Sequence, residues 1–165
     1  MKADFGILVL GTALLVSSCG PSGENNDPEP QSCNPFPAVN ELLMGKQWVE
    51  VAETTITVSG NDSIARNSYP DMAPCSQDDF MEFQPKGILV QDNGPNKCVP
   101  FMPQSLKGTW CTSNAGKTLT LTYGNQSGEL EIISLGPQQM ILRETRHNSP
   151  KSGQTELLIS THEPR

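Results

Sequence analysis

The sequence predicts an all-β protein, an eight-stranded antiparallel up-and-down barrel with a short N-terminal helix. Gly and Pro supply 14 residues each to a chain of 165, which favours short strands and turns over long helices. From Gly45 onward the apolar residues recur with a period of two, which is typical of strands with one buried face. Because no long helical crossover separates these strands, we expect them to be antiparallel and to close on themselves.

Residues 1–18 are predicted to be a lipoprotein signal peptide. Lys2 precedes an apolar run from Phe5 to Val16, which is too short to span a bilayer and is typical of a secretory signal. The run ends in Val16-Ser17-Ser18-Cys19-Gly20, which resembles the lipobox of bacterial lipoproteins, where cleavage falls before a cysteine that carries acyl chains such as palmitate. Cys19 is therefore the predicted lipidation site. The alternative is an ordinary signal peptide with a chance cysteine.

Residues 19–38 are predicted to comprise the lipidated cysteine and a flexible tether. The stretch from Gly20 to Gln31 has no aliphatic or aromatic side chain and carries only acidic charges, so it has nothing to bury. Gly20 does not resemble the aspartate-type signal for retention in the inner membrane, which favours the bacterial outer membrane. The acidic tether is either a surface-export signal or a solvated spacer, so the periplasmic or surface face stays open.

Residues 39–165 are predicted to form the barrel domain. A short helix is expected from Val39 to Met44, with Asn40 as a possible N-cap. Strands are expected in chain order over residues 46–58, 79–83, 87–91, 108–112, 117–123, 129–135, 138–146 and 154–161. The segments 60–77 and 95–107 are expected to be long loops.

Four cysteines remain besides Cys19: Cys33, Cys75, Cys98 and Cys111. An exported chain enters an oxidising compartment, where an even number of cysteines indicates disulfides, and four cysteines allow three connectivities. Zinc is the alternative, but the chain has no CxxC or HxxxH spacing, so we expect no metal site.

The barrel segment contains several short motifs in a fixed order: Cys75–Gly87, Asn96–Cys98, Gly108–Trp110, Gly116–Leu121, Ile132–Leu135 and Met140–Arg143. In this order they resemble the bacterial lipocalin-like domain lipoproteins, a mostly uncharacterised family with a calycin-type barrel. That family shows a cysteine followed by Asp-Asp, a strand ending in Phe, a Gly turn, a second cysteine, a Gly-Thr-Trp strand and a Thr-Leu-rich hairpin. The resemblance covers the chain from about Leu42 onward, and it implies a lipocalin-like barrel with a Cys75–Cys98 disulfide.

Two features depart from the family pattern. The family opens on Gly-x-Trp, whereas two residues separate Gly45 from Trp48, which affects the register of the first strand. Cys33 and Cys111 are additions to the pattern, which predicts that they pair with each other. If Trp110 points inward, Cys111 points outward, where a bridge to Cys33 would hold that segment on the outside of the barrel.

The leading functional hypothesis is that a small apolar or amphipathic ligand binds inside the barrel of an envelope lipoprotein. The candidate pocket consists of inward-pointing side chains: Met81, Phe83, Leu89, Trp110, Leu119, Leu121 and Met140. The alternative is an envelope protein-interaction or inhibitor module, whose barrel is filled and whose long loops make the contacts. An interior cavity of a few hundred Å³ would separate the two hypotheses.

No catalytic group of residues is recognised, so the protein is not expected to be an enzyme. Asp78 and Asp79 are adjacent in sequence, and successive strand residues point to opposite faces. With Asp92 they could contact calcium, but their spacing is unlike an EF-hand loop and favours a solvated turn. His147 and His162 flank the last predicted strand and are expected to be exposed.

The charge balance narrows the choice of partners. A net charge of −7 leaves no excess of Lys and Arg to neutralise phosphates, which argues against nucleic acid as a partner. We expect a monomer that contacts the membrane through Cys19, holds a small hydrophobic ligand and needs no cofactor.

Overall fold

The computed structural model describes residues 36–147 and 154–165. The predicted signal peptide, lipidation site Cys19, most of the predicted tether and the cysteine Cys33 lie outside these described residues. Among the helices of the described residues, none has the length and apolar character that crossing a membrane would need.

One short helix, α1 (Pro37–Leu43), precedes the strands. It begins at Pro37, which suits a first helical turn because the N–H that proline lacks would have no partner there. The predicted helix is therefore confirmed, with its start two residues earlier than the predicted Val39. Asn40 is not the N-cap; it lies inside the helix, where its side-chain oxygen accepts a hydrogen bond from the Thr112 hydroxyl at 3.1 Å.

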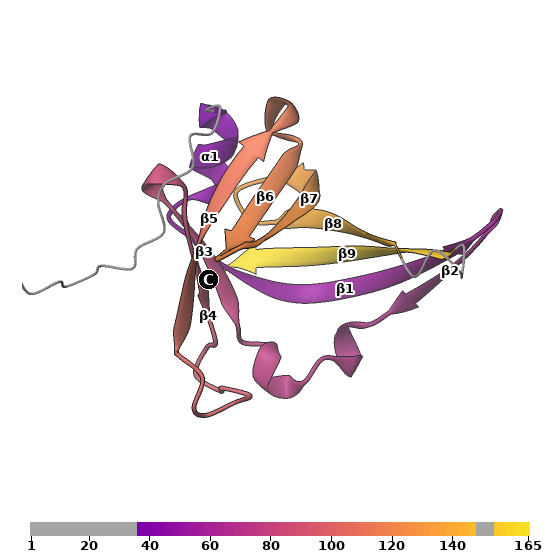
Figure 1. Ribbon diagram of the computed structural model, residues 1–165, viewed down its shortest axis with the longest axis horizontal. Helices are drawn as coiled ribbons and strands as arrows, with labels where there is room; N and C mark the ends of the chain where they lie inside the picture. Colours follow the sequence, from indigo (N-terminus) through magenta and orange to yellow (C-terminus); the bar gives the residue numbers. More distant parts are fainter. Residues whose placement is uncertain (1–35, 148–153) are drawn as a thin grey trace, which may run out of the picture.

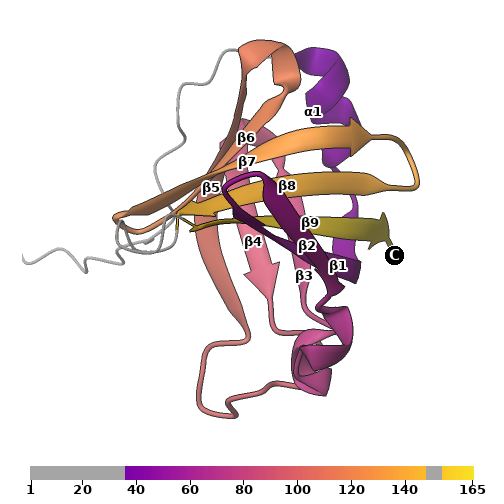
Figure 2. The same cartoon turned by 90° about the vertical axis from the view of Figure 1, so that its right-hand side faces the viewer.

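Eight of the strands close into an antiparallel barrel, as the sequence predicts (Figures 1 and 2). The sheet has the order β2-β1-β3-β4-β5-β6-β7-β8-β9, and β9 pairs back with β1, so the closed circuit consists of β1 and β3 to β9. The strand bounds are β1 (Gln47–Ser59), β2 (Asp62–Asn67), β3 (Phe80–Gln84), β4 (Ile88–Asp92), β5 (Ser105–Ser113), β6 (Thr118–Tyr123), β7 (Gln126–Leu135), β8 (Met140–His147) and β9 (Gln154–Pro164).

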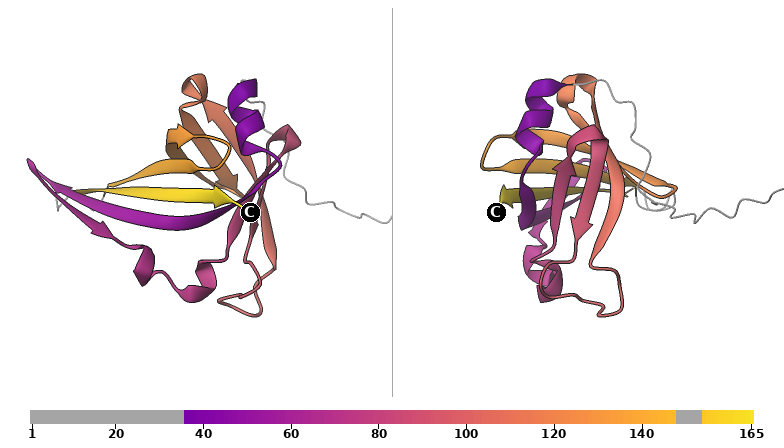
Figure 3. Two further views of the ribbon diagram at one scale, coloured as in Figure 1. Left: turned by 180° about the vertical axis from the view of Figure 1, so that it is seen from behind. Right: turned by 90° about the vertical axis from the view of Figure 1, so that its left-hand side faces the viewer.

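β2 is a strand where the sequence predicts only a loop. It pairs with Thr54–Ser59 of β1, while β3 pairs with Gln47–Val49 on the same edge of β1. All six residues of β2 are exposed, so no alternation of buried and polar side chains marks it in the sequence. Two short turns, η1 (Tyr69–Asp71) and η2 (Pro74–Ser76), complete the connection from β2 to β3 (Figure 3).

An irregularity between Glu50 and Ala52 changes which residues of β1 face the interior. Before it, Trp48 and Glu50 point inward. The extra residue in β1 has no counterpart in β9, and a one-residue shift moves the following side chains to the other face. Glu53 is then opposite Ser160, which lies on the same side of β9 as His162, the partner of Glu50. Two acidic side chains, Glu50 and Glu53, therefore follow each other on the inner face.

The hydrophobic core fills the part of the barrel next to α1. The Phe83 and Trp110 rings meet edge to face, with their centroids 5.4 Å apart. The indole Nε1 of Trp48 donates a hydrogen bond to the carbonyl oxygen of Leu43 at 2.9 Å, which joins the first strand to the end of α1. The buried core residues are Leu43, Trp48, Phe83, Leu89, Trp110, Leu119, Met140 and Leu142.

A disulfide joins Cys75 in η2 to Cys98 in the connection between β4 and β5, with the two Cα atoms 5.1 Å apart. The pairing implied by the family resemblance is thus confirmed. Trp110 is buried and Cys111 is half-buried, as their opposite directions on β5 require. Cys111 takes part in a disulfide as well, and Cys33, its predicted partner, lies outside the described residues.

Replacing Gly108 by alanine is expected to destabilise the pairing of β5 with β6. A Cβ atom at this position would lie 2.3 Å from the backbone oxygen of Thr122 and 2.7 Å from the ring of Tyr123. Because a backbone atom is in the way, the strands must move apart, at a cost of about 1–3 kcal/mol. Thermal unfolding should show a lower Tm for Gly108→Ala than for Gly128→Ala, whose added Cβ meets no heavy atom within 4 Å. Equal Tm values would contradict this account.

Candidate functional site

A cavity of about 350 Å³ lies beside the core, between the inner faces of β1, β3 and β9 and the connection that carries η1 and η2. We call it the mouth pocket. Trp48 and Met81 separate it from the buried core, and Met72 and Ser76 reach it from the connection. Its lining residues are Trp48, Glu50, Met72, Ser76, Asp79, Phe80, Met81, Gln91 and His162.

Three ionisable residues line the mouth pocket, and the strand register pairs two of them directly. Glu50 of β1 is the direct partner of His162 of β9. On the other edge of β1, the pairing with β3 ends at Val49 and Phe80, and Asp79 is the residue before Phe80. Directly opposite residues share one face of an antiparallel sheet, with Cβ atoms about 4.5–5.5 Å apart. We call Asp79, Glu50 and His162 the polar row.

The two carboxyl groups of the polar row are held in an environment that disfavours their charge. Burial, together with the nearby negative charge of Glu53, raises the pKa of Glu50 to about 7. Burial also raises the pKa of Asp79, together with the charges of Asp78 and Asp92. One oxygen of each, Oε1 of Glu50 and Oδ1 of Asp79, is buried without a hydrogen-bond partner. A group bound in the pocket could supply the missing donors.

His162 is buried, contrary to the exposed position predicted for it. Its side chain is only 5% exposed, and its Nε2 lies 3.0 Å from the hydroxyl of Ser160. The buried Nδ1 has no partner. The prediction was wrong because β9 continues to Pro164, which places His162 inside the strand between Glu50 of β1 and Met140 of β8. Burial lowers the pKa of His162 to about 4, so its imidazole is neutral near pH 7.

The adjacent aspartates diverge as the sequence predicts. Asp79 lines the mouth pocket, whereas Oδ2 of Asp78 accepts hydrogen bonds from the backbone N and the side-chain Nδ2 of Asn96, at 3.0 and 2.8 Å. Within the described residues, no three His, Cys, Asp or Glu side chains are grouped so as to hold a metal ion.

The structure places the seven candidate pocket residues in and around the core. Only Met81 is among the residues that line the mouth pocket. Phe83, Leu89, Trp110, Leu119 and Met140 belong to the buried core, and Leu121 packs against it. The predicted inward direction of these side chains is correct, but they contact one another and fill that part of the barrel. The sequence pattern does not indicate Glu50 or His162 as site residues, and it favours a solvated turn for Asp79.

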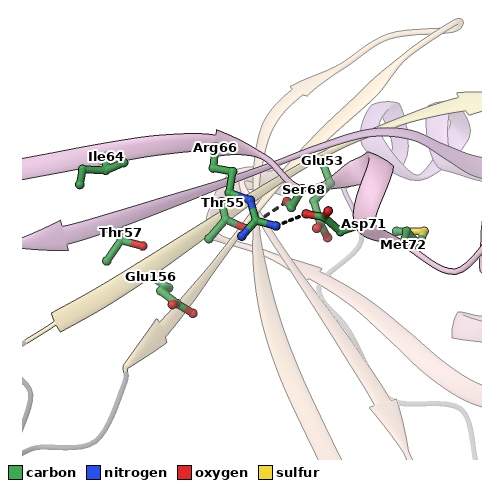
Figure 4. Close-up of a pocket in the computed structure, with 9 residues that line it drawn as sticks. All are labelled: Glu53, Thr55, Thr57, Ile64, Arg66, Ser68, Asp71, Met72 and Glu156. Atoms are coloured by element: carbon green, nitrogen blue, oxygen red, sulfur yellow. Dashed lines mark hydrogen bonds and ion pairs between the residues drawn. The ribbon is translucent and has the colours of Figure 1, made fainter.

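A second cavity, of about 470 Å³, continues along the inner face where β1, β2 and β9 project beyond the core (Figure 4). The hydroxyl of Thr55 donates to that of Ser68 at 3.0 Å, and Arg66 forms an exposed ion pair with Asp71. Met72 lines both cavities, so the two are neighbours. Arg66 and Asp71 of this second cavity pair with each other, whereas the polar row has unpartnered atoms.

Closure of eight antiparallel strands with a short helix at one end defines the class of this protein as a small antiparallel β-barrel. Among solved structures, the complex of bovine odorant binding protein with a selenium-containing odorant is similar to it. The two chains are 13% identical, the match covers 75% of this chain and 71% of that chain, and the TM-score is 0.39. No family model matches the sequence. No curated protein matches it either.

Two residues of the polar row, His162 and Glu50, are expected to change the free energy of unfolding with pH in opposite directions. The pKa of His162 falls from 6.5 to about 4 on folding, so its contribution is complete above pH 6.5 and is lost as pH falls toward 4, by up to about 3 kcal/mol. The pKa of Glu50 rises from 4.5 to about 7, so its contribution is complete below pH 4.5 and is lost as pH rises toward 7.

Urea unfolding between pH 4 and pH 8 can separate these two effects. Relative to the unmodified protein, His162→Gln should lose less stability as the pH falls from 6.5 toward 4. Glu50→Gln should lose less stability as the pH rises from 4.5 toward 7. Glu163→Gln is the matched control, because Glu163 is exposed on the opposite face of β9. Parallel pH profiles for all four proteins would contradict the assignment.

Proposed function

We propose that this protein binds a small amphipathic ligand in the mouth pocket. The apolar part of the ligand packs against Trp48, Met72 and Met81, and its polar part contacts the polar row. The observation that carries this proposal is a cavity of about 350 Å³ lined by apolar side chains and by three ionisable side chains, each of which has a buried polar atom without a partner. This volume lies within the usual range for small-molecule sites, and a few convergent polar groups in an apolar cavity are typical of them.

His162 does not match the role of a general base. A general base works best when its pKa lies near the working pH. Burial lowers the pKa of His162 to about 4, which makes the imidazole a weak base at neutral pH. The filled core next to α1 limits the ligand to the mouth of the barrel, so the ligand is small or leaves part of its length outside.

Native mass spectrometry of protein purified from its own host tests the proposal. We expect a small molecule to accompany the unmodified protein and to be lost from Met72→Trp, which narrows the pocket from the connection side. Met102→Trp is the matched control, because Met102 is exposed in the connection between β4 and β5 and does not line the pocket. Retention of the molecule by Met72→Trp would place it elsewhere and overturn the proposal.

A second candidate function, an envelope protein-interaction or inhibitor module, is favoured by one other observation. The connection between β4 and β5 exposes three apolar side chains, Val99, Phe101 and Met102, and the Phe101 side chain is 89% exposed. Such exposed apolar groups are typical of contact sites. A photo-crosslinker placed at residue 101, and another placed at residue 133 for comparison, test this second function in the intact host. A defined protein crosslinked from residue 101 but not from residue 133 supports the interaction module. The same crosslinked products from both positions oppose it.

We also propose that the protein is anchored to the bacterial cell envelope, most simply the outer membrane, through lipidated Cys19. The lipobox-like motif supports this location, and the Cys75–Cys98 disulfide is of a kind that persists outside the reducing cytosol. Cys19→Ala should move the protein from the membrane fraction to the soluble fraction. Retention in the membrane fraction would contradict the anchor.

A further inference from the structure

We propose that the mouth pocket selects amphiphiles with a cationic head group, and that an alkylammonium group binds at the polar row. This inference rests on the proposed function, because it names the chemistry of the ligand in the same pocket. It depends on the pocket that Asp79, Glu50 and His162 share, and on the charges that surround them.

The polar row presents hydrogen-bond acceptors without donors. Oε1 of Glu50 and Oδ1 of Asp79 are buried and have no partner. An ionised carboxylate can only accept hydrogen bonds, so a ligand satisfies these atoms only by bringing N–H or O–H groups. A buried carboxylate is also costly unless an opposite charge accompanies it. An ammonium group supplies the donors and the positive charge together.

His162 gives a second, independent indication that the pocket is built for a donor. Its side chain is 5% exposed and lines the mouth pocket, yet its Nδ1 has no partner. When the Nε2–H group donates to the hydroxyl of Ser160, Nδ1 carries the lone pair and accepts a hydrogen bond. Glu50 is the direct partner of His162, and Asp79 lines the same pocket, so an ammonium group at Glu50 has further acceptors within that pocket.

The charges around the polar row favour a cation over an anion. The acidic side chains of Glu53 on β1, Asp78 before β3 and Asp92 on β4 add negative potential to the two carboxyl groups. Arg165 beside the pocket is engaged elsewhere: its guanidinium stacks on Phe80 at 4.4 Å, and it donates to Oε1 of Gln47 and the backbone oxygen of Asp78. An amphiphile with a carboxylate head would therefore meet repulsion.

An organic ammonium fits the polar row better than a metal ion does. The three members come from β1, β9 and the residue before β3, and no three acidic, His or Cys side chains of the described residues are grouped for metal binding. An ammonium group with three N–H donors can bridge neighbouring acceptors without a fixed coordination geometry. Its alkyl part then packs on the apolar side chains of Trp48, Met72 and Met81.

Three probes with the same eight-carbon tail, octylammonium, 1-octanol and octanoate, test the head-group preference. They are titrated at pH 8 by calorimetry into the full chain carrying Cys19→Ala, which avoids detergent. We expect octylammonium to bind at least about tenfold more tightly than octanol, and octanoate to bind most weakly. Glu50→Gln and Asp79→Asn should each reduce the preference for octylammonium, whereas Glu163→Gln, the exposed control on the outer face of β9, should leave it unchanged.

The pH dependence adds a readout that a purely structural role would not change. Glu50 must be ionised to pair with an ammonium group, so the affinity for octylammonium should rise from pH 5 to pH 8, while the affinity for octanol should not.

Because an ammonium head occurs in free amines and in lipids, parallel titrations with phosphatidylethanolamine and phosphatidylglycerol vesicles distinguish the two sources. If the protein binds phosphatidylethanolamine vesicles but not phosphatidylglycerol vesicles, the ammonium group belongs to a lipid. If it binds octylammonium but neither kind of vesicle, the ammonium group belongs to a free amine.

The outcomes separate this inference from the function on which it rests. If all three probes bind with equal affinity, the pocket binds amphiphiles but the cation preference is wrong. Tighter binding of octanoate than of octylammonium would overturn it as well. If none of the three probes binds, the proposed binding function fails together with the inference.

Discussion

Replacing Trp48 by alanine is expected to lower the free energy of unfolding by about 3–5 kcal/mol, which is the usual cost of removing a large buried aromatic side chain. The Trp48 side chain is fully buried in the core. It also ties β1 to the end of α1 through its hydrogen bond to the Leu43 carbonyl. Since domains of this size are stable by about 5–15 kcal/mol, urea unfolding should show a large shift of the midpoint toward lower urea.

A second variant keeps this prediction testable if Trp48→Ala does not fold. Trp48→Phe retains most of the apolar contact but removes the N–H donor, so the buried Leu43 oxygen loses its partner. Loss of one such hydrogen bond costs about 1–3 kcal/mol. We therefore expect Trp48→Phe to lie between Trp48→Ala and the unmodified protein. A Trp48→Phe variant as stable as the unmodified protein would show that the bond to α1 contributes nothing.

The sequence predicts the barrel well because its signals are local. Alternation of apolar and polar residues marks the eight strands that close the barrel, and short Gly-containing turns follow β3 at Pro85–Gly87 and β5 at Asn114–Gly116. β2 escapes prediction because each of its six residues is exposed, so burial leaves no pattern in it. It is held in place by pairing with the part of β1 that β3 does not reach.

The site is less predictable, because alternation indicates which face a side chain points to and not what lies next to it. Phe83 and Leu119 point inward as predicted, but Leu43 from α1 and Trp48 complete the packing around them. Whether an inward side chain faces a cavity therefore depends on residues far away in the sequence. His162 shows the same limit, since its burial depends on β9 continuing past the predicted end at Thr161.

Glu50 could have been found from the sequence alone. It lies two residues after Trp48, so the same alternation that buries Trp48 also turns Glu50 inward. An acidic residue on the buried face of a predicted strand is unusual and indicates a functional site. Its neighbours could not have been found in this way, because the pairing of β1 with β9 and β3 is set by long-range contacts.

Removing the Cys75–Cys98 disulfide with the double variant Cys75→Ala/Cys98→Ala is the other change with a large expected effect. The two cysteines are 23 residues apart, and closing a loop of that length stabilises a folded chain by about 3 kcal/mol. Urea unfolding of the double variant and of the unmodified protein, both without reductant, measures this loss. An unchanged midpoint would show that the disulfide adds nothing to the stability of the barrel.

The same double variant should also weaken ligand binding, because the disulfide holds one wall of the mouth pocket. Cys75 immediately precedes Ser76, which lines the pocket, and the Ser76 hydroxyl lies 3.2 Å from the sulfur of Cys98. Once released, η2 and the approach to Asp79 would have to be ordered by the ligand itself, which costs conformational entropy. We therefore expect weaker octylammonium binding by the double variant at temperatures where it is still folded. Unchanged affinity would mean that β1, β3 and β9 alone preserve the pocket.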